Sequence, residues 1–152
     1  MLTSVQARAG RLCRHGSVVL LVMPNYTKVN LKEIEDQAPS GGLSPGLKAH
    51  FARIPLALEK SGISYFRLAP DFRLPFGHKH SDQEEVYLVV GGSARAKLDD
   101  EVIELGPWDA LRVPTGVMRS LEAGPDGAEI IAFGAPNTEN ADVEMTPGWW
   151  TD

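Results

Sequence analysis

The sequence predicts a single domain of the all-β class, and three observations support this. The chain has 152 residues, a length that suits one domain better than two. From residue 48 onward, short apolar segments alternate with glycine, proline and aspartate turn signals, as in β-barrels and β-sandwiches. No long segment shows the periodicity of an amphipathic helix. Folding at this length buries roughly 70% of the unfolded surface, which is enough for a hydrophobic core.

The N-terminal residues differ in character from the rest of the chain. Residues 1–32 contain five basic residues and no acidic one. The apolar run Ser17–Met23 is at the short limit for a signal peptide, and no small-residue cleavage site follows it. We expect residues 1–22 to form a flexible, dispensable extension, with an arm that packs on a partner subunit as the alternative. The domain is then residues 23–152, with its core in residues 48–135.

The expected strands follow a proline- and glycine-rich loop at residues 36–47. The run at residues 85–90 is apolar on both faces, so we expect both of its faces to be buried. Further strands are expected at residues 48–54, 63–68, 94–98, 102–105, 110–113, 117–122 and 129–133.

Three glycine- or aspartate-rich turns separate the later strands. Gly91-Gly92 is expected to end the strong strand, because glycine tolerates the positive φ of a sharp turn or bulge. Asp99-Asp100 predicts one hairpin turn, and Gly124–Gly127 predicts a second.

Composition argues against several classes of partner. The net charge is −5 and no basic stripe is visible, so we expect no nucleic-acid partner. No apolar run approaches the roughly 20 residues of a membrane span. The single cysteine, Cys13, cannot form an internal disulfide. We expect a cytoplasmic protein whose partner is a small-molecule ligand.

The residues with the clearest chemistry are concentrated at positions 77–87. Side chains alternate along a strand, so His78 and His80 are expected to point to the same face. A short turn follows, and one carboxylate of Glu84-Glu85 can return to face the two histidines. Two imidazoles and a carboxylate form a three-ligand set for Fe, Mn, Ni or Zn, with positions left open for water or substrate.

This segment resembles the first motif of the cupin superfamily. That motif reads His-x-His, three or four residues, Glu, six residues and Gly, and this chain matches it with His78, His80, Glu85 and Gly92. The spacing of Glu84 to Gly91 fits equally, but the four-residue gap and the run EEVYLVV favour Glu85 as the ligand. The resemblance covers roughly residues 48–135. It implies a double-stranded β-helix, a jelly-roll-like barrel with the site inside, and a homodimer.

The second motif of the superfamily, Pro-x-Gly-x-x-His, is only partly present. Pro114 and Gly116 match it, whereas Arg119 replaces the histidine that usually supplies a fourth ligand. An arginine stays protonated and cannot ligate a metal ion. Two interpretations follow: three ligands hold the metal while Arg119 binds an anionic substrate, or Arg119 pairs with Glu85 and replaces the metal's charge.

Two further side chains are candidates for the site. His50 would supply a fourth ligand if it points inward, although an isolated strand histidine is more often a surface or core residue. Tyr87 is a candidate substrate-binding donor, with core packing as the alternative. The resemblance favours a metal-dependent enzyme of the dioxygenase, isomerase or lyase type acting on a small anionic molecule. The alternative is a non-catalytic, metal-free cupin that binds a small molecule.

Overall fold

The computed structural model describes residues 25–135 and 142–152. The expected N-terminal extension, residues 1–22, lies outside the described residues. The domain boundaries therefore stay a prediction.

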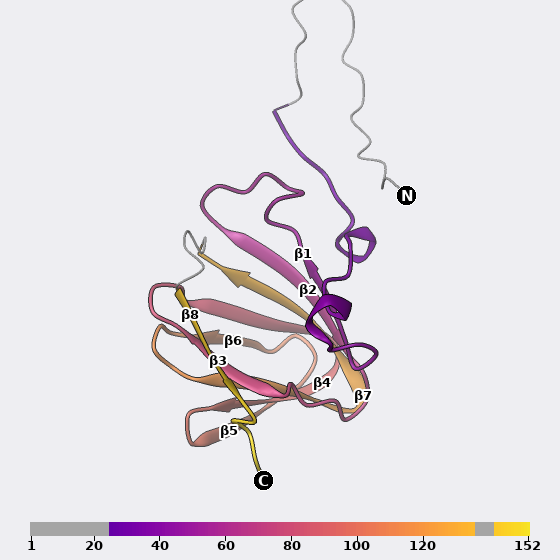
Figure 1. Ribbon diagram of the computed structural model, residues 1–152. Helices are drawn as coiled ribbons and strands as arrows, with labels where there is room; N and C mark the ends of the chain where they lie inside the picture. The colour runs from indigo at the N-terminus through magenta and orange to yellow at the C-terminus, as the bar shows by residue number, and fades with distance from the viewer. Residues whose placement is uncertain (1–24, 136–141) are drawn as a thin grey trace, which may run out of the picture.

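The regular secondary structure of the described residues is almost entirely antiparallel β-strand, which confirms the all-β prediction (Figure 1). Two short 3₁₀ helices, η1 (Leu31–Glu33) and η2 (Pro39–Gly41), precede the strands. The strands are β1 (Leu47–Phe51), β2 (Gly62–Leu68), β3 (Phe76–His80), β4 (Glu85–Leu98), β5 (Glu101–Leu105), β6 (Ala110–Val113), β7 (Arg119–Gly134) and β8 (Val143–Pro147).

The strands form one sheet that curls around the core. Neighbouring strands follow the order β1-β2-β7-β3-β8, and β4 pairs with β5, β6 and β7. β7 is therefore the central strand, because it contacts β2, β3 and β4. Figure 1 shows β3 and β8 side by side, with the C-terminus leaving from β8.

The expectation that Gly91-Gly92 ends a strand is wrong. β4 continues from Glu85 to Leu98, and the register with β7 shifts on both sides of the glycine pair. Gly92 has φ 66°, and a Cβ there would lie 2.0 Å from the Gly127 carbonyl oxygen. Glycine is required at this position because the two backbones approach too closely for any side chain.

The expected hairpin at Gly124–Gly127 is also wrong. Ala123 pairs with Ala94, and Ala128 pairs with Gly92, so both halves of β7 lie along the same strand, β4. The four-residue segment is a large bulge rather than a reversal of the chain. The hairpin at Asp99-Asp100 is confirmed, since β4 and β5 pair up to Leu98 and Glu101 around it.

The hydrophobic core lies on the inner face of the curled sheet, where β4 and β7 supply most of its members. In β4, Tyr87 and Val89 are buried, whereas Val86 and Leu88 on the opposite face are only half-buried. The expectation that both faces of this strand are buried therefore holds for one face only, because nothing in the described chain fully covers the outer one.

The C-terminal residues dock on the outside of the barrel. The ammonium group of Lys97 lies 4.7 Å from the ring centre of Trp149, and the guanidinium of Arg73 lies 4.8 Å from that of Trp150. A Cβ on Gly77 would lie 2.6 Å from the Trp149 ring, so this glycine of β3 leaves room for the indole. The C-terminal tail is thus packed against the strand that carries the two histidines.

Within residues 25–135 and 142–152, no helix is both long and apolar enough to cross a membrane. The cytoplasmic location expected from the sequence stays a prediction.

Candidate metal centre

β3 presents the two histidines to the same side of the sheet, as the alternation of side chains requires. The ring centres of His78 and His80 lie 5.4 Å apart, with the rings nearly perpendicular. Lys79, between them, points the other way and forms an ion pair with Glu144 of β8 at 3.0 Å. His80 is buried and His78 is half-buried, so both imidazoles are largely withdrawn from water.

Glu85, the first residue of β4, faces this histidine pair. Its Oε2 lies 3.6 Å from Nε2 of His78 and 3.6 Å from Nε2 of His80. One ligand atom from each of the three residues lies within 4.8 Å of the other two. Atoms that share one transition-metal ion at about 2.1 Å lie roughly 3–4 Å apart, so the donor set and its spacing fit a divalent cation.

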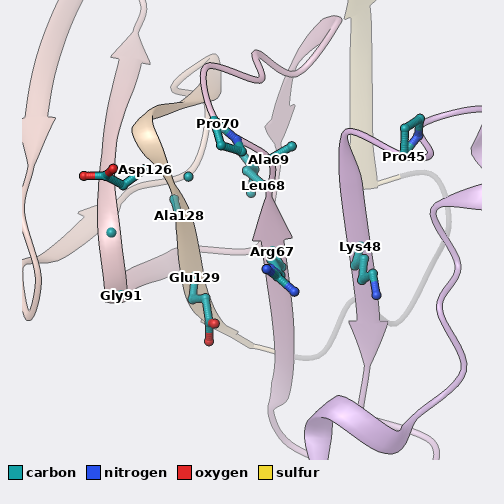
Figure 2. A pocket seen from close by; sticks show the side chains of 12 residues that line it. Pro45, Lys48, Arg67, Leu68, Ala69, Pro70, Gly91, Asp126, Ala128 and Glu129 are labelled. Atoms are coloured by element: carbon teal, nitrogen blue, oxygen red, sulfur yellow. The ribbon is translucent and has the colours of Figure 1, made fainter.

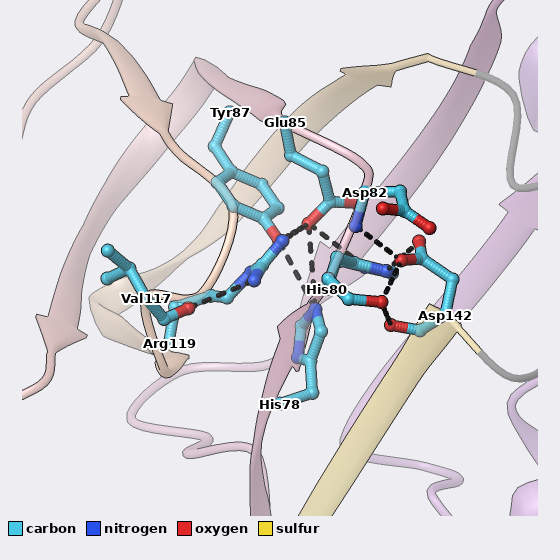
Figure 3. A network of polar contacts seen from close by, with 9 residues as sticks. His78, His80, Asp82, Glu85, Tyr87, Val117, Arg119 and Asp142 are labelled. Carbon is cyan, nitrogen blue, oxygen red and sulfur yellow. Dashed lines mark hydrogen bonds and ion pairs between the residues drawn. The ribbon is translucent and has the colours of Figure 1, made fainter.

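The same carboxylate oxygen also receives two strong hydrogen bonds (Figure 3). The Tyr87 hydroxyl donates to Glu85 Oε2 at 2.5 Å, and Nη2 of Arg119 donates to it at 2.7 Å. Arg119 is fully buried at 0% exposure, and its Nη1 donates to the Val117 carbonyl at 3.0 Å. An imidazole pair, a carboxylate, a phenol and a guanidinium therefore converge on one point.

The surroundings of Glu85 keep its carboxylate ionised. Burial raises the pKa of Glu85, but its contacts with His78, Tyr87 and Arg119 outweigh burial and lower the pKa to about 2. Burial, followed by the negative charge of Glu85, raises the pKa of Tyr87, so the phenol remains a hydrogen-bond donor. The carboxylate is thus available as an anionic ligand throughout the neutral pH range.

A second carboxylate, that of Asp142, contacts the other ring nitrogen of His80. Oδ2 of Asp142 lies 3.0 Å from Nδ1 of His80, on the side of the ring away from Glu85 (Figure 3). Burial is the largest influence on the pKa of His80 and lowers it below its ordinary value, which favours the neutral imidazole that a metal ion requires. Carboxylate–histidine pairs of this kind commonly support metal ligands in proteins.

Two buried nitrogen atoms of the cluster lack a hydrogen-bond partner among the described residues. They are Nδ1 of His78 and Nε of Arg119. Buried polar atoms are usually paired, so these two mark the place where the cluster is incompletely satisfied.

Comparisons with known proteins identify the architecture. No protein-family model matches the sequence, and no curated protein matches it. Among solved structures, a cupin protein from Bacteroides fragilis is 24% identical, with 77% of this chain and 89% of that chain covered and a TM-score of 0.62. A Streptomyces Pac13 variant with uridine is 16% identical, with coverage of 82% and 93% and a TM-score of 0.64. Oxalate decarboxylase from Bacillus subtilis is 22% identical, with coverage of 86% of this chain but 33% of that chain and a TM-score of 0.62.

The chain has the cupin fold. The double-stranded β-helix expected from its first motif is therefore confirmed. Because the sequence identities are below 25%, the likeness concerns the fold alone.

The geometry of this cupin barrel separates the two candidate glutamates. Glu84 lies on the surface, where its carboxylate accepts from Nε of Arg112 at 2.7 Å. Glu85, one residue later, is the glutamate that lies beside His78 and His80. The alternation of β4 places these neighbours on opposite faces, so only one of them can reach the interior.

His50 does not join the cluster. Its Nδ1 lies 2.7 Å from the Ile34 carbonyl oxygen, and its ring stacks on Tyr65 with 5.6 Å between ring centres. The inward orientation of His50 considered from the sequence is therefore not the one observed.

The contact between Asp142 and His80 was not predicted from the sequence, because Asp142 lies 62 residues from His80 and no motif includes it.

A cavity of about 370 Å³ lies elsewhere, on the surface where β1, β2 and β7 meet the loops at their ends (Figure 2). Its charged lining residues, Lys48, Arg67, Asp126 and Glu129, carry two charges of each sign. No residue of the histidine cluster lines it. The candidate metal ligands therefore lie away from this groove.

Proposed function

We propose that this protein is a metal-dependent cupin enzyme in which His78, His80 and Glu85 hold a divalent ion of Fe, Mn, Ni or Zn. The observation that carries the proposal is the convergence of their three donor atoms, with 3.6 Å from Glu85 Oε2 to each Nε2. Both distances are longer than those of well-formed hydrogen bonds, so the imidazoles face the carboxylate at ion-pair range rather than in close hydrogen bonds. That arrangement is expected of ligands that surround a common ion.

The charge of the site favours an anionic substrate. Arg119 already neutralises Glu85 through their 2.7 Å contact. A divalent cation would therefore leave the buried site with a net positive charge, which a carboxylate or phosphate group of a substrate would balance. Both terminal nitrogens of Arg119 are engaged, so its proposed contribution to substrate binding is mainly its positive field, with the Tyr87 hydroxyl beside it.

Neighbours in fold show what such a barrel can support. Pac13 is described as a nucleoside dehydratase, and a second neighbour is an oxalate decarboxylase. Fold alone does not select a reaction, so we propose chemistry of the dioxygenase, isomerase or lyase type. A bound ion with open positions would polarise a substrate oxygen or activate water or dioxygen.

One observation favours a second candidate function. The partial second motif aligns Arg119 with the usual fourth ligand, and Arg119 is already paired with Glu85, so its guanidinium can serve as a permanent substitute for a metal ion. In that case the barrel is a metal-free binder of a small molecule.

Metal titration separates these two functions. Purified protein freed of metal with a chelator is titrated with Mn(II), Fe(II), Ni(II) and Zn(II) and compared with the His78→Ala/His80→Ala variant. We expect one ion per chain in the wild type and none in the variant. Glu85→Gln should also lose the ion, because the Glu85 carboxylate faces the histidines. Glu84→Gln is its matched control and should keep the ion, because the Glu84 carboxylate lies on the surface beside Arg112. Absence of binding by the wild type would favour the metal-free barrel.

We further propose that the protein forms a homodimer through the outer face of β2, β7 and β4. Ile63 and Val86 flank Phe133 in adjacent strands, and Phe133 is 41% exposed, so an apolar row lies open along this face. Light scattering during size-exclusion chromatography should give twice the chain mass, and Phe133→Asp should give the monomer. A monomeric wild type at micromolar concentration would contradict the proposal.

A further inference from the structure

The carboxylate of Asp142 has two oxygens with different partners. Asp142 lies immediately before β8 and is buried at 9% exposure. Its Oδ1 accepts from the Asp82 backbone N–H at 2.7 Å and from the Ser81 hydroxyl at 2.9 Å. Its Oδ2 faces Nδ1 of His80 at 3.0 Å. Figure 3 shows the carboxylate held between the β3–β4 turn and the imidazole.

These contacts determine which nitrogen of His80 carries the proton. A backbone N–H can only donate, so the contact with Asp82 fixes Oδ1 as an acceptor. An ionised carboxylate only accepts, so Nδ1 of His80 must donate to Oδ2. The neutral ring then has its lone pair on Nε2, the atom that lies 3.6 Å from Glu85 Oε2.

We propose that Asp142 is a positioning residue, which holds His80 as the Nδ1–H tautomer and thereby makes its Nε2 a metal ligand. This inference rests on the proposed metal-binding function. The two histidines differ in this respect, because Nδ1 of His78 has no hydrogen-bond partner among the described residues. His80 is the pre-oriented ligand, whereas no hydrogen bond to Nδ1 sets the tautomer of His78.

The C-terminal strand brings Asp142 to the site. β8 pairs with β3 over its whole length, from Phe76–Pro147 to His80–Val143. β3 pairs with β7 at a single register position, His78 opposite Arg119. The backbone carbonyl of Asp142 also accepts from the Ser81 N–H at 3.1 Å, which continues the β8 pairing past the end of the strand. The C-terminal segment that pairs with β3 therefore also supplies the carboxylate that faces Nδ1 of His80, the last residue of β3.

The variant Asp142→Asn tests the proposal with little change of shape. The Asp82 N–H still requires an acceptor, so the amide oxygen should take the place of Oδ1 and the amide NH₂ should face His80. Nδ1 would then accept, and the proton would move to Nε2, where it blocks ligation. We expect the imidazole nitrogen chemical shifts of metal-free His80 to report this exchange by NMR. We also expect Zn(II) affinity to fall by roughly 10–100-fold.

Asp82→Asn is the control, because it removes the same charge next to the site while its backbone N–H remains. It should leave both the tautomer and the Zn(II) affinity unchanged. The proposal is overturned if metal-free wild-type His80 carries its proton on Nε2, a measurement that needs no variant. It is also overturned if Asp142→Asn keeps the wild-type tautomer and affinity. A tautomer exchange in a protein that binds no Zn(II) would support the role of Asp142 and refute the metal proposal alone.

Discussion

At the scale of single residues, the chemistry of the site is concentrated on one oxygen atom, Oε2 of Glu85. Tyr87 and Arg119 donate to it, and both imidazoles of the histidine pair face it. The sequence predicted these contacts in part, because the alternation of a strand places His78 and His80 on one face and their spacing to Glu85 allows its return. It could not predict Asp142, since a contact across 62 residues depends on how β8 docks.

The pKa of Glu85 leads to a prediction about acid stability. A carboxyl whose pKa falls from 4.5 to about 2 on folding stabilises the fold at pH values above 4.5, and this contribution is lost as the pH falls through about 2. With a metal chelator present, Glu85→Gln removes this contribution of the ionised carboxylate to the unfolding free energy. We therefore expect the difference in unfolding free energy between wild type and variant to shrink by about 3 kcal/mol between pH 5 and pH 2.

Urea denaturation at successive pH values measures this difference. Glu84→Gln, whose carboxylate lies on the surface beside Arg112, serves as the control and should show a much smaller dependence on pH. Parallel pH profiles for the wild type and Glu85→Gln would contradict the assignment of Glu85 as the buried anion of the site.

Arg119 gives a second prediction at this scale. Replacing it with histidine removes a buried positive charge beside the proposed ion and offers a fourth nitrogen ligand. We expect Arg119→His to raise Zn(II) affinity at least about tenfold in a competition titration with a coloured chelator. Arg112→His, which changes an exposed arginine in the same way, should leave the affinity unchanged. An unchanged affinity in Arg119→His would argue against residue 119 lying at the fourth ligand position.

At the scale of secondary-structure elements, the sequence predicted where strands lie better than where they turn. Short apolar segments between turn signals located β1, β2, β5 and β6 closely, whereas β4 and β7 were each expected as two shorter strands. Glycine pairs were misleading, because the positive φ that makes a turn also makes a bulge. Gly92 lies against the Gly127 carbonyl of the neighbouring strand, and that approach depends on which strands are neighbours.

β3 is the element on which the site depends, and its packing is testable. A methyl group on Gly77 would meet the Trp149 ring at 2.6 Å, so Gly77→Ala should destabilise the fold by roughly 1–3 kcal/mol through overpacking. In a Trp149→Ala background the same change should cost much less, because the indole is gone. Thermal or urea unfolding of the wild type, the two single variants and the double variant gives the coupling energy between Gly77 and Trp149. Additive costs would show that Trp149 does not lie over Gly77 in solution.

At the scale of the whole molecule, the double-stranded β-helix was expected from the motif resemblance rather than from patterns of hydrophobicity. Periodicity indicates strands but does not say that β7 lies between β2, β3 and β4. The curled sheet brings β3, β4 and β7 to one place, where the histidines, Glu85 and Arg119 meet. The C-terminal segment completes this arrangement through β8, Asp142 and the docked tryptophans.

The most direct test of the central claim is a crystal structure of the protein soaked with Mn(II) or Zn(II), with anomalous scattering recorded at the metal's absorption edge. The proposal predicts one strong anomalous peak bonded to Nε2 of His78, Nε2 of His80 and the carboxylate of Glu85, and no such peak in the His78→Ala/His80→Ala variant. An intact Arg119–Glu85 pair without a peak, in crystals soaked at millimolar metal, would contradict it and identify the barrel as metal-free.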